Sequence, residues 1–188
     1  SLRWSVPWLL FLSAFLLFYC VRPSHSRGWS EDQSRVPWAT IEGDTIRFHE
    51  VRDFRYTSPT EWESAWYDAD FKLSELEKGY FVVEYFSEHE AIAHTLVSFR
   101  FAGDRFLAFS VEIRKEKGES FSPVRGLFRQ YELLYVVADE RDVLKLRTHY
   151  RDSRVRLHPI EGSAEGLRAY FLDVVGRVND LKAKPEFY

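Results

Sequence analysis

The sequence predicts an α+β fold, with an N-terminal transmembrane helix followed by a mixed domain that has a mainly antiparallel sheet and a long C-terminal helix. Three observations carry this prediction. A charge-free apolar stretch opens the chain, several short runs with strand-like alternation follow, and a helical apolar stripe closes it. The strands and helices do not alternate regularly, which is typical of α+β domains rather than of parallel α/β sheets.

The apolar stretch from Trp4 to Val21 contains no charged residue. As a helix it would be about 27 Å long, from about 1.5 Å per residue, which is close to the thickness of a hydrocarbon core. Trp4, Trp8 and Tyr19 stand near its ends, where amphipathic aromatic rings settle at the membrane interface. We therefore expect a membrane helix over residues 4–21. The rival is a cleaved signal peptide, which a poor cleavage site disfavours.

Residues 22–40 are expected to form a linker, since the part from Pro23 to Pro37 is rich in Ser, Gly, Pro and mixed charge. The globular domain is then expected over residues 41–188. The only cysteine, Cys20, excludes an intramolecular disulfide framework and a cysteine-rich zinc site. The net charge is −3 with interspersed signs, so we expect no nucleic-acid partner. The sequence leaves the oligomeric state open.

Strands are expected where apolar and polar residues alternate or where a short apolar run occurs. These positions are Thr45–Val51 with one irregularity, Tyr80–Phe86, the segments around His94 and Phe109, Tyr131–Val137 and Val155–Leu157. Trp62, Trp66 and Tyr67 are expected in a loop that wraps the core. Lys72–Lys78 is expected to form a short helical turn.

Two helices are expected in the second half of the chain. Asp139–Tyr150 has helical spacing and opens with acids, which suit a helix N-terminus. The last helix begins after Ser163, a good N-cap residue, and carries an apolar stripe from Leu167 to Leu181.

The two strands around His94 and Phe109 are predicted to form a hairpin. A slip of one residue would move every side chain to the opposite face, so the apolar pattern fixes the register. A three-residue loop, Ala102 to Asp104, keeps the apolar faces together and sets His94 directly across from Glu112. His94, Ser110 and Glu112 are therefore expected on one polar face, with Arg114 as a further candidate.

His94 and Glu112 are the candidate catalytic residues. A carboxylate beside an imidazole fixes its tautomer and stabilises the imidazolium, as in a nucleophile–base–acid triad. The alternative is a structural cross-strand polar pair, which is worth about 0.2–1 kcal/mol. The residues alone leave both open.

Other chemistry has weaker support. His89 and His94 are five residues apart, which suits neither one strand face nor the helical zinc-protease motif, and we expect no metal and no cofactor. Ser120 lacks the second glycine of a nucleophile elbow. The stretch from Arg114 to Ser120 is expected to be a solvated loop. A set of arginines that could bind an anion is expected to pair with nearby acids: Arg125, Arg129, Arg141, Arg147, Arg151 and Arg154.

Several long runs resemble a known family in the same order. They are AHTLVSFRF (Ala93 to Phe101), SVEIRKEKGESFSP (Ser110 to Pro123), GLFRQYELLYVVADERD (Gly126 to Asp142), LRTHYR (Leu146 to Arg151) and KPEFY (Lys184 to Tyr188). The family is the bacterial Lnb-type N-terminal periplasmic domain, and the resemblance extends from Arg22 to Tyr188. It implies a location at the bacterial inner membrane with the globular domain facing the periplasm.

The resemblance also implies a function. The family is similar to circularly permuted papain-like proteins, in which the histidine precedes the cysteine, and His94 matches that histidine as general base. It further implies a cysteine–histidine acyltransferase for lipoprotein N-acylation, or an amide hydrolase of the same type. Membrane lipids and lipoproteins are the partners that this activity implies.

In the family, an Asn-Cys-Thr-type motif follows the Pro-Glu-Phe-Tyr sequence, whereas the present sequence stops at Tyr188. The chain also contains no methionine. We therefore expect a fragment of a longer protein, inactive as it stands. The alternative function is a non-enzymatic cell-envelope module that binds or anchors a partner through the aromatic surface around Trp62 and Trp66.

Overall fold

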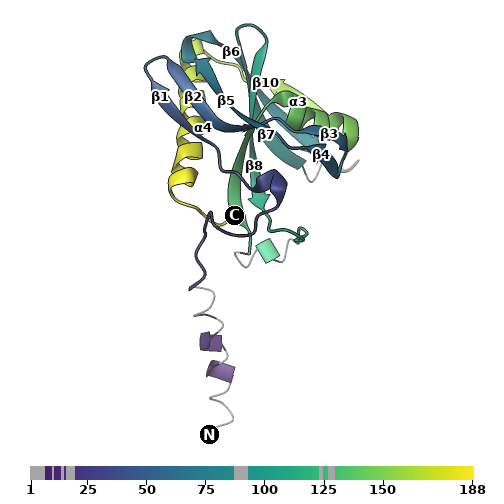
Figure 1. The fold of residues 1–188 in the computed structure, drawn as a ribbon. Helices are drawn as coiled ribbons and strands as arrows, with labels where there is room; N and C mark the ends of the chain where they lie inside the picture. Colours follow the sequence, from purple (N-terminus) through teal and green to yellow (C-terminus); the bar gives the residue numbers. More distant parts are fainter. Residues whose placement is uncertain are drawn as a thin grey trace.

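The computed structural model describes residues 7–9, 11–13, 15, 20–86, 93–122, 125–126 and 130–188. A central sheet has the strand order β1-β2-β9-β8-β7-β6-β10, and β5 also pairs with β2 (Figure 1). Neighbours are antiparallel except at the single β2–β9 pair, Arg52 with Ala138. The strands are β1 (Trp38–Glu42), β2 (Thr45–Arg52), β5 (Trp66–Lys72), β6 (Leu76–Tyr85), β7 (Ala93–Phe101), β8 (Arg105–Arg114), β9 (Glu132–Ala138) and β10 (Arg154–Pro159).

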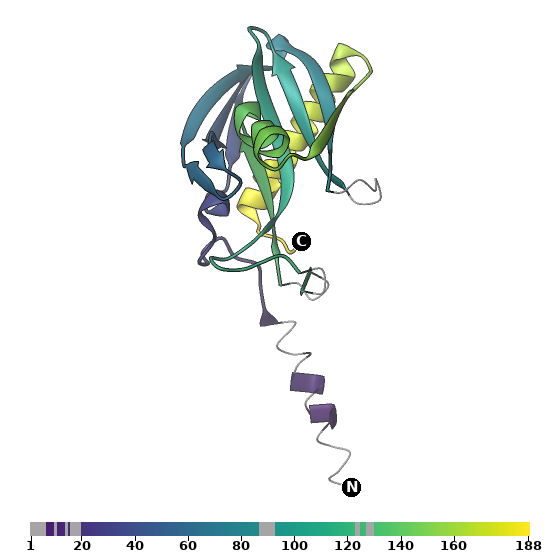
Figure 2. The ribbon, with the colours of Figure 1, turned by 90° about the vertical axis from the view of Figure 1, so that its right-hand side faces the viewer.

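A different layer covers each face of the sheet. The long helix α4 (Ala164–Ala183) packs on one face, and the short helix α3 (Glu140–Lys145) with the π turn η3 (Leu146–Tyr150) lies on the other (Figures 1 and 2). The small hairpin of β3 (Arg55–Ser58) and β4 (Glu61–Glu63) packs beside η3. Two single 3-10 turns complete the fold, η1 (Glu31–Gln33) and η2 (Leu73–Glu75).

The α4 side holds the larger core, which is built from phenylalanine rings. Phe171 of α4 is fully buried and contacts the rings of Phe48, Phe99, Phe101 and Phe109. Alternation along β7 and β8 points these rings toward α4, because successive side chains on a strand face opposite sides. The residues between them, including Ser98 and Ser110, therefore face α3.

The predicted fold class is wrong in two respects. The domain is mostly β, because stretches expected to be linker or loop are strands, namely β1 and the run from β3 to β5. β5 pairs with the distant strand β2, and β3 and β4 pair with an irregular register, so local alternation did not reveal them. β1 pairs regularly with the next strand, β2, across the turn Gly43–Asp44, and the linker prediction overlooked this hairpin. The antiparallel pairing and the C-terminal helix agree with the prediction.

The predicted transmembrane helix is the second error. Among the described residues, no helix is long and apolar enough to cross a membrane. The prediction rested on the whole stretch 4–21, of which positions 4–6, 10, 14 and 16–19 lie outside the described residues; positions 7–9, 11–13, 15 and 20 are helical.

Most other elements lie close to their predicted positions. Ser163 caps α4 by accepting a hydrogen bond from the Gly166 amide, and Asp139 caps α3 from the Arg141 amide. The irregularity predicted in β2 is a bulge at Glu50, whose φ is 60°. The expected turn over Lys72–Lys78 shrinks to η2, because β6 already begins at Leu76.

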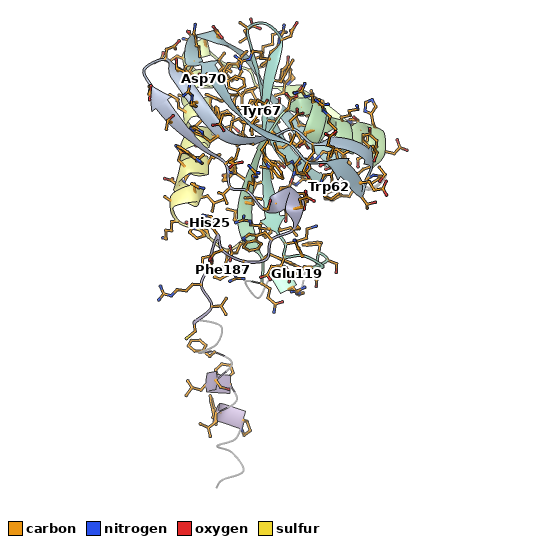
Figure 3. The ribbon with its side chains drawn as sticks, in the orientation of Figure 1. His25, Trp62, Tyr67, Asp70, Glu119 and Phe187 are labelled. Atoms are coloured by element: carbon orange, nitrogen blue, oxygen red, sulfur yellow. The ribbon has the colours of Figure 1, made fainter. Side chains whose placement is uncertain are left out.

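The segment 22–40, expected to be a linker, packs against the end of β8, where Ser30 and Gln33 bind the carbonyl oxygens of Lys115 and Ile113. Trp29, Gln33 and Val36 are buried, and β1 begins within this segment. His25 lies where α4 ends (Figure 3), with Nε2 3.1 Å from the carbonyl oxygens of Leu181 and Lys182.

Arg114 is buried against this segment, so the expectation of a solvated loop from Arg114 onward is wrong for its first residue. The Arg114 guanidinium donates to the carbonyl oxygens of Gln33 and Ser34 and lies 4.3 Å from the Trp29 ring centre. Its Nη1 lies 3.2 Å from His25 Nδ1. Burial lowers the pKa of Arg114 to about 10.

We predict that Phe171→Ala lowers the free energy of unfolding by about 3–5 kcal/mol, the usual cost of removing a buried aromatic ring. Chemical denaturation measures the change. Tyr170→Ala is the matched control, because Tyr170 is the neighbouring aromatic residue but is 38% exposed, and its loss should be clearly smaller. Equal losses for the two variants would contradict this account of the core.

We also predict that the packing of the N-terminal segment weakens in acid. Burial and the charge of Arg114 lower the pKa of His25 from its usual 6.5, so the folded protein favours the neutral ring. This contribution to stability is complete above about pH 6.5 and is lost as the pH falls through the folded pKa. Thermal unfolding between pH 7.5 and 5 measures it.

The control for this prediction is His25→Gln, which keeps a donor and an acceptor but does not titrate. Burial raises the pKa of nearby Glu132, so that carboxyl group changes stability in the opposite direction as the pH falls. The difference between wild type and His25→Gln isolates the histidine. Parallel pH profiles for the two proteins would contradict the prediction.

Candidate active site

The β7–β8 hairpin has the predicted register. Leu96 pairs with Ser110 and Phe101 with Arg105, and the loop is Ala102 to Asp104. Gly103 and Asp104 both have positive φ, 76° and 56°, which a tight hairpin turn requires. His94 and Glu112 therefore share the face toward α3, with His94 Nε2 3.3 Å from Glu112 Oε1.

A chain of hydrogen bonds joins these residues. His94 Nε2 lies 2.7 Å from Ser110 Oγ, the Ser110 hydroxyl donates to Glu112 Oε1 at 2.6 Å, and Arg147 Nη2 donates to the same oxygen at 3.0 Å. A hydroxyl has one proton, and Ser110 gives it to Glu112. Ser110 Oγ must therefore accept from His94, which places the imidazole proton on Nε2. Nδ1 then carries the lone pair, and it has no hydrogen-bond partner among the described residues.

Glu112 is ionised in this arrangement. Burial alone would raise the pKa of the carboxyl group, but the hydrogen bond and charge of His94, the charge of Arg147 and the Ser110 hydroxyl outweigh it. The pKa of Glu112 is consequently held well below its usual range. The side chains of His94 and Glu112 are 18% and 25% exposed, so a reactant can still reach them.

Sequence reasoning did not identify Glu84 as part of the site, nor the role of Arg147 in it. Glu84 of β6 pairs with His94 in register and is fully buried. Its Oε2 accepts from Arg147 Nε at 2.7 Å, while its Oε1 has no partner among the described residues. A charged residue inside the apolar run of β6 was the available signal.

Arg147 reaches both acids because α3 is fixed on the sheet. Asp142 accepts two hydrogen bonds of 2.8 Å from Arg52 and one from the Phe54 amide, and Asp142 is fully buried. This pair ties the start of α3 to β2. Arg147, just after α3, then lies over β6 and β8, where it also donates to the Val143 carbonyl.

Ser110 is not placed to act as a nucleophile, although it touches His94. Its side chain is completely buried, and its proton goes to Glu112 rather than to the imidazole. In a serine triad the acid would instead bind the far nitrogen of the histidine.

Metal chemistry finds no support in the described part of the chain, where no group of three His, Cys, Asp or Glu side chains could hold an ion. His89 lies outside the described residues. The only cysteine, Cys20, is exposed on the N-terminal stretch.

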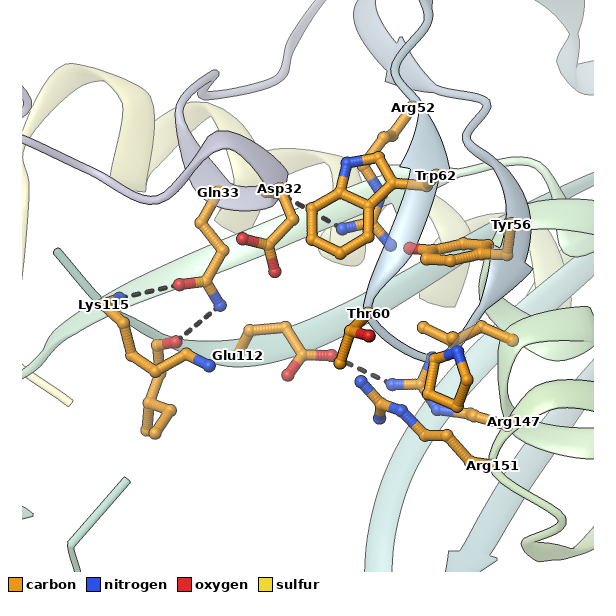
Figure 4. A pocket seen from close by; sticks show the side chains of 13 residues that line it. Asp32, Gln33, Arg52, Tyr56, Thr60, Trp62, Glu112, Lys115, Arg147 and Arg151 are labelled. Carbon is orange, nitrogen blue, oxygen red and sulfur yellow. Dashed lines mark hydrogen bonds and ion pairs between the residues drawn. The ribbon is translucent and has the colours of Figure 1, made fainter. Parts of the chain in front are cut away.

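A polar cavity of about 400 Å³ adjoins Glu112 and Arg147 (Figure 4). It lies between β8, η1, the β3–β4 hairpin and η3. Its lining residues are Asp32, Gln33, Arg52, Tyr56, Pro59, Thr60, Trp62, Glu112, Ile113, Lys115, Leu146, Arg147 and Arg151.

The arginines suspected of binding an anion differ in their contacts. Arg125 pairs with Glu119, and Arg141 with Asp53 and Asp139. Arg154 packs over the Tyr85 ring, with its Cζ 4.6 Å from the ring centre. Arg151 is exposed and forms no ion pair with a described residue. Arg129 lies outside the described residues.

The aromatic residues proposed as a binding surface, Trp62 and Trp66, are half-buried and pack against other side chains. Trp62 stacks on Phe54 with ring centres 6.0 Å apart, and Trp66 contacts the same ring at 4.8 Å. Arg35 covers the outer side of Trp66, with its Cζ 4.4 Å from the ring centre. These contacts give the rings a role in the packing of the β3–β4 hairpin.

A sheet covered on both faces, with a histidine and a carboxylate next to a polar cavity, defines a sheet-based domain with a polar site on one face. Comparison with known sequences identifies the family. The model of the Lnb N-terminal periplasmic domain matches residues 62–188, and the chain belongs to this family. The family indicates a domain that faces the periplasm. No curated protein and no solved structure matches the chain.

We predict that Arg147→Ala lowers the free energy of unfolding by about 3–5 kcal/mol, because it leaves the buried charge of Glu84 without compensation. Arg47→Ala is the control: it also removes an arginine that binds a carboxylate at two nitrogens, but the side chains of Arg47 and its partner Asp70 are 58% and 47% exposed. That loss should stay below about 1 kcal/mol. Denaturant unfolding of both variants measures the difference, and similar small losses would rule out a structural role for the buried bridge.

Proposed function

We propose that His94 is the general base of a cysteine–histidine acyl-transfer site in this periplasmic domain. The observation that carries the proposal is the hydrogen-bonded chain His94–Ser110–Glu112. In it the imidazole proton lies on Nε2, and the Nδ1 lone pair has no partner among the described residues. An imidazole oriented in this way by a carboxylate is suited to accept a thiol proton. The family to which the chain belongs is consistent with this site.

The chemistry proceeds in two balanced steps. His94 Nδ1 takes the thiol proton, the thiolate attacks an ester carbonyl, and the alcohol leaves with the proton from the imidazolium, so that a thioester remains. An amine then attacks the thioester, His94 Nδ1 takes the proton that the amine loses, a new amide bond forms, and the thiolate leaves and recovers that proton as a thiol. Glu112, ionised and bonded through Ser110, stabilises the imidazolium that forms in between.

The resemblance described above predicts the thiol just after the Pro-Glu-Phe-Tyr sequence. Residues 186–188 pair with the start of β9: the Leu133 amide donates to the Glu186 carbonyl, and the Tyr188 amide donates to that of Tyr131. β8 and β9 lie between this segment and His94, so three strand spacings, about 14 Å, separate them laterally. A few extended residues cover such a distance, at about 3.3 Å each.

The acyl donor in this proposal is a membrane lipid, and the acceptor is the N-terminal amine of a lipoprotein. A periplasm-facing domain meets both at the surface of the inner membrane. No membrane helix forms part of the proposal, since the described residues contain none.

We predict that His94→Ala in the full-length protein lowers lipoprotein N-acylation by about 10²–10⁴-fold, the usual contribution of a positioned general base. Mass spectrometry of lipoprotein N-termini measures the product. Glu112→Gln should give a smaller loss, because the imidazole stays in place but its cation is less stabilised.

The matched control is His158→Ala, which removes an exposed histidine from β10, away from the site. It should leave acylation unchanged. Unchanged acylation in a folded His94→Ala protein would show that His94 is structural and would refute the proposed function.

A further inference from the structure

We propose that the cavity beside Glu112 binds a phosphate ester group. Binding at this cavity does not depend on the proposed function, and only the role of the ligand as substrate rests on it.

The floor of the cavity is built from side chains that hold one another in place. Arg52 is fixed by two bonds to Asp142, and Arg147 by its bonds to Glu84 and Glu112. Gln33 is buried, donates to the Ile113 carbonyl and accepts from the Lys115 amide (Figure 4). A ligand therefore meets a preorganised surface, which lowers the entropic cost of binding.

Two cationic side chains at the cavity have no ionic partner among the described residues, and we call them uncommitted. Lys115 and Arg151 form no ion pair or side-chain hydrogen bond with a described residue, and they approach the space beside Glu112 from different elements (Figure 4). Arg52 and Arg147 add donors, since each guanidinium has five N–H groups and uses three of them here. Several cationic donors that converge from different directions suit the oxygens of a phosphate group.

The acids of the cavity do not cancel this charge. Glu112 is already engaged by Arg147, Ser110 and His94, and Glu84 and Asp142 are engaged by arginines. Among the lining residues, Asp32 is the remaining carboxylate, and its single negative charge is smaller than the two positive charges of Lys115 and Arg151. The uncommitted side chains therefore leave a net positive charge for an anion.

The size and walls of the cavity favour an ester over a bare ion. About 400 Å³ lies within the range of small-molecule sites and exceeds the space that a single phosphate occupies. Tyr56 and Trp62 line it with apolar ring surface, and their ring centres are 5.8 Å apart. The rings provide contact for the carbon part of a glycerophosphate-like group.

The cavity is also linked to the candidate base. Glu112 and Arg147 both line it, and both belong to the hydrogen-bonded network of His94. A phosphate group bound at Arg151 and Lys115 would hold a neighbouring ester on the side of the sheet that carries His94. This chemistry occurs both in a phospholipid headgroup and in a soluble phosphate monoester.

The test measures binding of glycerol 3-phosphate to the protein by calorimetry, with inorganic phosphate as a second probe. Arg151→Ala and Lys115→Ala should each weaken binding of glycerol 3-phosphate by about 10-fold, the cost of one charge-assisted hydrogen bond of about 1.4 kcal/mol. Lys145→Ala is the matched control, because it removes an exposed cation from α3 outside the cavity, and it should leave binding unchanged. Trp62→Ala should weaken glycerol 3-phosphate more than inorganic phosphate.

A second arm separates the sources of the ligand. We test whether vesicles of phosphatidylglycerol in phosphatidylcholine compete with glycerol 3-phosphate for the protein. Competition that is seen with wild type and lost with Arg151→Ala indicates a lipid headgroup. Saturable binding of glycerol 3-phosphate without vesicle competition indicates a soluble ester.

The binding test is independent of catalysis. His94→Ala should still bind glycerol 3-phosphate measurably, because His94 does not line the cavity, so loss of acylation and loss of binding are distinguishable. Absence of measurable binding to wild type, or equal affinities in wild type, Arg151→Ala and Lys115→Ala, would overturn the assignment of the cavity.

Discussion

The arrangement of the site depends on one buried guanidinium, that of Arg147, which lies between Glu84 and Glu112. Burying ions costs several kcal/mol each, and only a complete set of partners compensates for the loss of water. Arg147 supplies much of this compensation with three different nitrogens, bound to two strands and to the carbonyl of Val143. The layer of α3 and η3 is thereby fixed over β6, β7 and β8. The two acids that Arg147 binds are also the neighbours of His94 on the adjoining strands.

The fold could be predicted where the signal is local. The Ser163 cap, the α4 stripe and the β7–β8 register follow from neighbouring residues, and the structure confirms them. Strand β5 could not be found in this way, because it pairs with the distant strand β2 across a register shift. The hairpin of β1 and β2 is local and regular, so its absence from the prediction was an oversight of the Gly43–Asp44 turn. The membrane prediction failed for a related reason: apolar content and length describe a stretch of sequence, whereas the described residues form no helix of that length.

The site, like the fold, could be predicted only where its residues are close together in the sequence. His94 and Glu112 lie on one hairpin, so alternation and loop length alone brought them together, and the 3.3 Å contact confirms that placement. The partners that come from other strands and helices could not be predicted from the sequence. Arg147 belongs to a turn that only the anchoring of α3 brings to the sheet, and Glu84 is recognisable as part of the site only after β6 is placed beside β7. Arg114 shows the converse error: a charged residue assumed to be solvated is buried under Trp29.

The network couples the base to the cavity through shared groups. Arg147 has a fixed number of donors, and it divides them between Glu84 and Glu112 while part of it lines the cavity. An anion that draws on Arg147 competes with Glu112 for the guanidinium, so that Glu112 depends more on Ser110 and His94 for its hydrogen bonds. The candidate base and the cavity therefore depend on the same guanidinium, and the packing of η3 that places Arg147 serves both.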